Sequence, residues 1–192
     1  MSNPRLTRKW LVLAAIVLLI MGPTAQALTY TVNTTNDFIV AGACANGTAG
    51  CSLRGAMTEA QAQSGEDQIV LTIPSSDPGC VDGVCTINLT AQLPDITQAV
   101  SISGPSPEQM IVRRTTGGDY RIFRSSSIGP VSFTGLGISN GLRDDTDGGG
   151  ILNAAIGTMT IEIVPLATIQ PVEPPRQASG AEAVSPTLAG DA

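Results

Sequence analysis

From residue 68 onward the chain is divided into short β-rich runs, and this division limits the accessible folds more than any other feature. Val, Ile and Thr fill the runs, and Gly, Pro, Asn and Asp separate them. The runs cover residues 69–73, 86–89, 99–102, 110–113, 121–123, 131–133, 136–139 and 158–163. Such short strands suit stacked turns of a solenoid. A β-sandwich is the alternative, but its hairpins usually carry clearer two-residue turn signals.

The first 27 residues have the pattern of a secretory signal. Arg5, Arg8 and Lys9 precede an aliphatic run over residues 10–21. That run is shorter than the roughly 20 apolar residues that a bilayer-spanning helix needs. Ala25 and Ala27 form a small-residue cleavage site, so we expect export and a mature chain that begins near Leu28. An uncleaved membrane anchor is the alternative; otherwise the chain meets a membrane only during export.

The charge of the mature chain disfavours one class of partner, and its composition excludes several kinds of chemistry. Without residues 1–27, seven basic residues face sixteen acidic ones, which gives a net charge of −9. Nucleic-acid binding is disfavoured, because it needs a basic face. The chain has no His, and its only Lys and Trp lie in the first 27 residues. Ser-His-Asp catalysis, His-metal sites and Lys bases therefore cannot be built in the mature protein.

All four cysteines lie in the exported part, where an oxidising compartment makes disulfides the default. Three pairings are formally open. The short separations favour Cys44–Cys51 and Cys80–Cys85, each worth about 2 kcal/mol on a chain-entropy estimate. A four-thiolate zinc site is the alternative, but neither pair has the CxxC spacing.

One short helix is expected between Ser52 and Gly65. Its apolar residues recur with helical spacing at Leu53, Ala56, Met57 and Ala60. Ser52 is a suitable N-cap, because its hydroxyl can accept an N–H of the first turn. We expect the apolar stripe to cover the open end of the first layer of strands.

The hexapeptide at residues 51–56, CSLRGA, resembles the CSLREA domain, an N-terminal module of exported bacterial proteins that lead into pectate-lyase-like right-handed parallel β-helices. Its context follows the same order: a strand at 30–33, a cysteine at 44, the helix to 65 and a strand at 67–71. Residues 131–141 and 148–153 look like the repeated phrases of such β-helices. The resemblance covers residues 29–163.

Gly55 departs from the family pattern, which has an acidic residue at this position. In a capping box the acidic side chain reaches back to the backbone N–H of the N-cap residue. Its loss, with a glycine in the first turn, costs on the order of 1 kcal/mol. Gly55→Glu is therefore expected to raise the melting temperature.

Pattern and resemblance together predict an all-β protein, a right-handed parallel β-helix with one short N-terminal capping helix. The expected divisions are a signal peptide at 1–27, a CSLREA-like cap at 28–67, β-helix turns at 68–163 and a disordered proline-rich tail at 164–192. The tail carries Pro165, Pro171, Pro174, Pro175 and Pro186, which cannot continue a ladder.

One acidic cluster is a candidate metal site. Asp144, Asp145 and Asp147 precede three glycines, and carboxylates at a turn can hold Ca²⁺. A solvated loop is the alternative, because no EF-hand or glycine-rich nonapeptide repeat surrounds the cluster. We expect no other cofactor.

The expected function is that of an exported or cell-surface, non-enzymatic, adhesin-like protein that contacts an extracellular glycan or a surface protein. It could be a fragment of a longer surface protein. A polysaccharide lyase or hydrolase of the pectate-lyase-like type is the alternative. Its acid–base groups would come from the three aspartates and from neighbouring arginines, namely Arg113, Arg114, Arg121, Arg124 and Arg143.

Overall fold

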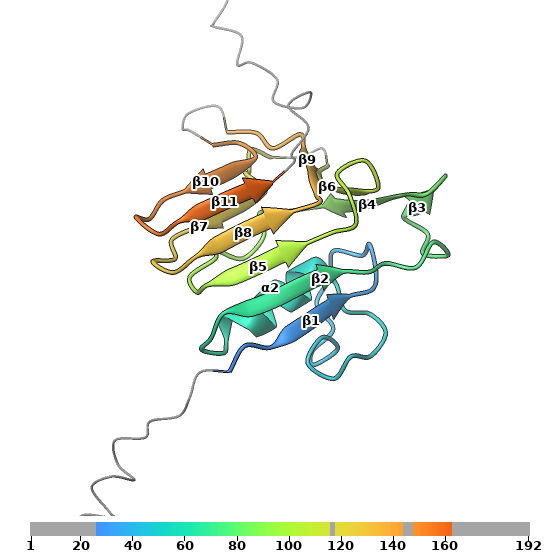
Figure 1. The fold of residues 1–192 in the computed structure, drawn as a ribbon. Coiled ribbons are helices and arrows are strands. Elements are labelled where there is room, and N and C mark those ends of the chain that lie inside the picture. The colour runs from blue at the N-terminus through green and yellow to red at the C-terminus, as the bar shows by residue number, and fades with distance from the viewer. Residues whose placement is uncertain (1–25, 116–117, 144–147, 163–192) are drawn as a thin grey trace, which may run out of the picture.

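The computed structural model describes residues 26–115, 118–143 and 148–162. Five of its eleven strands form a parallel sheet in the order β1-β2-β5-β8-β11. This sheet faces the viewer in Figure 1. Its strands are β1 (Thr29–Val32), β2 (Asp67–Leu71), β5 (Val100–Ser103), β8 (Val131–Thr134) and β11 (Met159–Glu162).

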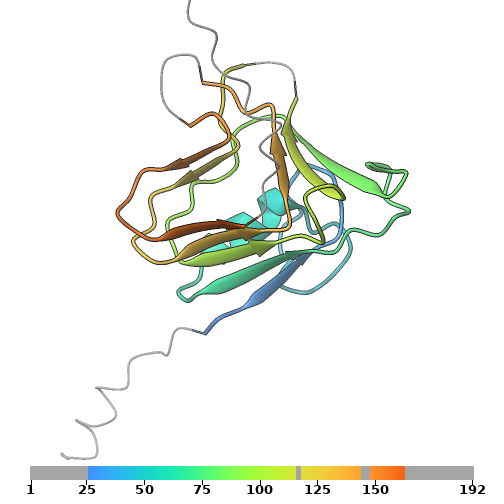
Figure 2. The same ribbon diagram turned by 45° about the horizontal axis from the view of Figure 1, so that its top comes forward.

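Two smaller sheets lie on one side of the five-stranded sheet (Figure 2). A four-stranded sheet contains β3 (Cys80–Val81), β4 (Val84–Leu89), β6 (Met110–Arg114) and β9 (Gly137–Ser139), and a parallel pair contains β7 (Phe123–Ser125) and β10 (Ile151–Asn153). The β3–β4 hairpin is antiparallel. Its two turn residues, Asp82 and Gly83, both have positive φ, at 51° and 82°, as a type I′ turn requires.

The core lies between these sheets, because alternate residues of each strand point inward. In the five-stranded sheet one inward row runs through Tyr30, Ile69, Ile102, Phe133 and Ile161. The first four members are at most 2% exposed. Phe123 of β7 packs on Phe133 with ring centroids 4.8 Å apart and so joins two of the sheets.

The helix α2 (Leu53–Gln61) contributes a second part of the core. It lies behind β1 and β2 in Figure 1 and contacts both strands. The predicted stripe is confirmed, since Leu53, Ala56, Met57 and Ala60 are all buried. The helix ends at Gln61, before the expected end near Gly65.

The predicted fold class, an all-β right-handed parallel β-helix, is wrong. The described residues form a mixed α/β arrangement of one helix and eleven short strands in parallel and mixed sheets, with no solenoid or closed barrel. Two features explain the error. Successive strands of the five-stranded sheet begin 38 to 28 residues apart, so no fixed repeat exists. The Asp82-Gly83 turn, a strong hairpin signal, makes β3 and β4 antiparallel.

Two expectations about the chain ends fall largely or wholly outside the described residues: the signal peptide, of which only Gln26 and Ala27 are described, and the disordered tail at 164–192. Within the described ranges, no helix has both the length and the apolar composition needed to cross a bilayer.

Candidate functional site

The entrance of α2 is fixed by Ser52, as the sequence predicted. The Ser52 hydroxyl accepts the backbone N–H of Gly55 at 3.0 Å and donates to the Phe38 carbonyl at 2.7 Å. Gly55 itself is buried. A Cβ at this position would lie 3.3 Å from Ser52 Oγ and 3.5 Å from Cys44 Sγ. Crowding beside the cap therefore opposes the stabilisation expected from Gly55→Glu.

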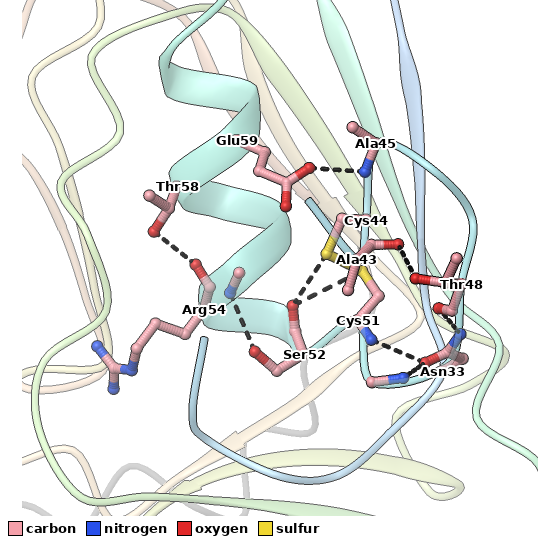
Figure 3. Close-up of a disulfide and its surroundings, with 12 residues drawn as sticks. Asn33, Ala43, Cys44, Ala45, Thr48, Cys51, Ser52, Arg54, Thr58 and Glu59 are labelled. Carbon is pink, nitrogen blue, oxygen red and sulfur yellow. Dashed lines mark hydrogen bonds between the residues drawn. A yellow bond between two sulfur atoms is a disulfide. The ribbon is translucent and has the colours of Figure 1, made fainter. Parts of the chain in front are cut away.

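The disulfide Cys44–Cys51 closes the loop that precedes α2 (Figure 3). Asn33, directly after β1, anchors this loop: its side-chain oxygen accepts the N–H groups of Gly50 and Cys51, and its amide donates to the Thr48 carbonyl. On the other side, Glu59 of α2 accepts the Ala45 N–H at 2.6 Å. The loop is thus tied both to the first strand and to the helix.

Arg54 links the helix to two distant segments. Its Nε lies 2.9 Å from Asp37 Oδ1, and its two terminal nitrogens donate to the carbonyls of Ala91 and Gln92. Asp37 also accepts the backbone N–H and hydroxyl of Thr90. Sequence reasoning missed this network. Its only signal was the Arg within the hexapeptide, because the partners lie 17 and 37 to 38 residues away.

The second disulfide, Cys80–Cys85, joins β3 to β4, so both cysteine pairs are those that short separation favoured. It borders a hollow of about 380 Å³ at the carboxyl ends of β2 and β5, hereafter the hollow. Val70, Ile73 and Met110 supply apolar wall, and polar groups come from Thr72, Ser75, Ser103 and Gln109. Every side chain that lines the hollow is neutral at pH 7, and both of its cysteines are oxidised.

One ionisable group, Asp77, holds the connection between β2 and β3. Burial raises the pKa of its carboxyl, but hydrogen bonds from Thr35, Gly79 and Thr34 outweigh burial and hold the pKa below its ordinary value. Thr35 donates both its backbone N–H and its hydroxyl, and Gly79 donates its N–H at 2.9 Å. The group is structural, because it joins the segment after β1 to this connection.

The candidate calcium ligands Asp144, Asp145 and Asp147 lie outside the described residues. Within those residues, no group of three His, Cys, Asp or Glu side chains could hold a metal ion. Of the predicted cleavage residues, Ala25 is not described and Ala27 is exposed. The next residue, Leu28, donates its N–H to Asp67 Oδ1 at 2.9 Å. The residue at which we expect the mature chain to begin is therefore hydrogen-bonded to the start of β2.

The arginines of the alternative enzymatic hypothesis hold loops and strand faces. Arg113 donates to Asn88, Arg114 donates to the carbonyls of Thr115, Gly118 and Asn140, and Arg143 donates to the Asp119 carbonyl. Arg124 pairs with Asp95, and Arg121 is 6% exposed. None of these side chains lines the hollow.

Comparisons with known proteins give no family assignment. No protein-family model, curated protein or solved structure matches the chain.

Proposed function

We propose that the protein is an exported, non-enzymatic, adhesin-like protein that binds glycans outside the cell. The observation that carries the proposal is the chemistry of the hollow, whose lining side chains are all neutral. Acid–base cleavage of a glycan needs two carboxylates, or an acid and a base, that face one groove. Hydroxyl, amide and apolar groups instead provide the contacts with which proteins hold a sugar without cleaving it.

Two further features support export and the family resemblance. Both cysteine pairs are oxidised, which fits an oxidising compartment. The hexapeptide Cys51–Ala56 supplies a disulfide, an N-cap and the Arg54 network at the start of one buried helix. The cysteine, the serine and the arginine of the hexapeptide thus each have a structural role in the resembling segment.

The test is to incubate the protein, purified after export, with a panel of neutral and acidic polysaccharides. Retention is measured by affinity electrophoresis, and cleavage is measured by reducing ends and by ultraviolet absorbance of unsaturated products. We expect retention by at least one glycan without product release. Product release would support the lyase or hydrolase instead, and no retention by any glycan would overturn the proposal.

A further inference from the structure

The outward face of the five-stranded sheet carries two aligned rows of side chains. The first row contains Thr29, Gln68, Ser101, Ser132 and Thr160, and the second contains Thr31, Val70, Ser103, Thr134 and Glu162. We call these ten residues the hydroxyl face, because seven of them carry a hydroxyl group. None of the ten is buried, and in Figure 1 no described helix or strand lies in front of them.

The rows form a regular lattice. Neighbouring strands lie about 4.8 Å apart, and residues two apart on one strand are separated by about 6.7 Å. The hydroxyls of the seven Ser and Thr residues make no hydrogen bond to another protein group within the part of the chain that the structure describes. Each strand therefore offers similarly placed hydrogen-bond donors and acceptors to a ligand that crosses the outward face of the sheet.

The charge of the face selects the kind of partner. Its only ionisable residue is Glu162, at the β11 edge, although the mature chain has a net charge of −9. A polyanion would be repelled by the protein as a whole and would find no cation on this face. A neutral partner that is itself rich in hydroxyl groups complements the face.

The small free energy of each hydrogen bond at this face requires a ligand with a repeating structure. A single hydrogen bond to an exposed hydroxyl contributes only about 0.5–1.5 kcal/mol, because water is displaced from both groups. Useful affinity therefore needs several such contacts made together. A pyranose ring in an extended glycan has nearly the length of one strand spacing. A glycan laid across the strands would thus present about one ring to each strand.

The hollow continues the face at one side. Val70 and Ser103 belong to the second row and also line the hollow, together with Gln109 and Met110. A chain or branch that crosses the face can therefore enter the hollow, which has an apolar wall and the amide group of Gln109. This continuity connects the face to the site on which the proposed function rests.

We propose that the hydroxyl face and the hollow bind an extended, neutral polysaccharide that runs across the strands. This inference deepens the proposed glycan-binding function and rests on it. It commits to a neutral, regularly repeating glycan, since the charge of the face does not fit an acidic one.

The experiment measures retention of the exported protein by insoluble cellulose in a depletion assay. The variant S103E/S132E places two charges at the centre of the face, on diagonal positions of β5 and β8 that do not oppose each other. We expect it to lower retention at least about tenfold. The control T86E/S139E adds the same charge on half-buried positions of the four-stranded sheet and should bind as the parent does.

A milder variant guards against misfolding. S101A/S132A removes two hydroxyls without adding charge and should weaken retention about three- to tenfold, while the melting temperatures of all variants are measured in parallel. Equal retention of the parent and S103E/S132E would overturn the inference. Retention by acidic polysaccharides alone would overturn the inference and leave the proposed function standing, whereas retention by no glycan would overturn both.

Discussion

The strands β1 and β11 form the two edges of the same sheet, yet they differ sharply in burial. Each has four residues and pairs in parallel with a single neighbour. In β1, Tyr30 and Val32 are 2% and 0% exposed, whereas Ile161, which continues the row of Tyr30 in β11, is 46% exposed. Because the pairing is equivalent, pairing alone does not produce a buried edge.

The difference comes from what covers each edge. At β1 the helix α2 packs on the inward side, and the disulfide-closed loop is bonded to Asn33 at the strand end. At β11 no described element provides such a cover, and Ile156 on the preceding connection is 98% exposed. We therefore expect stability to be concentrated at the β1 edge of the sheet, which α2 covers and which we call the helix end.

The largest effect is expected from Asp37→Ala at the helix end. The Asp37 side chain is 8% exposed, and its removal leaves the Arg54 side chain, which is only 16% exposed, without its carboxylate partner. Such a loss typically costs about 3–5 kcal/mol of unfolding free energy. Asp95→Ala is the matched control, because it removes the partner of Arg124 in a pair that is 36% exposed on both sides, and it should cost at most about 1 kcal/mol. Urea unfolding measures both, and equal losses would contradict the contrast.

Substitutions of two isoleucines in one inward row compare how much unfolding free energy is lost in the sheet interior and at the β11 edge. Ile69→Ala creates a cavity at a fully buried position and should cost about 2–5 kcal/mol. Ile161→Ala, at the half-exposed end of the row, should cost about 1 kcal/mol. The same urea titrations report the difference, which would vanish if β11 were as well covered as β2.

Removing the first disulfide tests the loop that covers the helix end. C44S/C51S releases a short loop and should lower the unfolding free energy by about 2–3 kcal/mol. Hydrogen exchange should then accelerate first in residues 42–51 and in the first turn of α2, where Ser52 and Gly55 pack beside the cysteines. Acceleration confined to β10 and β11 would be inconsistent with this role.

A smaller, pH-dependent effect is expected at Asp77. Its pKa is lower in the folded than in the unfolded state, so its stabilising contribution is present above the unfolded pKa of about 4. That contribution is lost as the pH falls through the lower folded value. Asp77→Asn should therefore reduce the melting temperature at pH 7 and have progressively less effect below about pH 4. A melting-temperature difference between Asp77→Asn and the parent that stays constant from pH 7 to pH 2 would refute the lowered pKa of Asp77.

Local features of this fold followed from the sequence. Ser52 caps the helix, its stripe is buried, and the short cysteine separations matched both disulfides, because each depends on residues a few positions apart. Long-range features did not follow. Short strands between turn residues do not specify which strands pair, and the link from Arg54 through Asp37 to Thr90 joins segments up to 53 residues apart. The hydroxyl face likewise emerges only when the four registers that join the five strands are known.

The most direct test of the contrast is native-state hydrogen exchange at the two edge strands. We predict that amides of β1 bonded to β2 exchange at least about tenfold more slowly than amides of β11 bonded to β8. Equal protection of β1 and β11, or slower exchange in β11, would contradict the claim that the covered helix end holds the fold together.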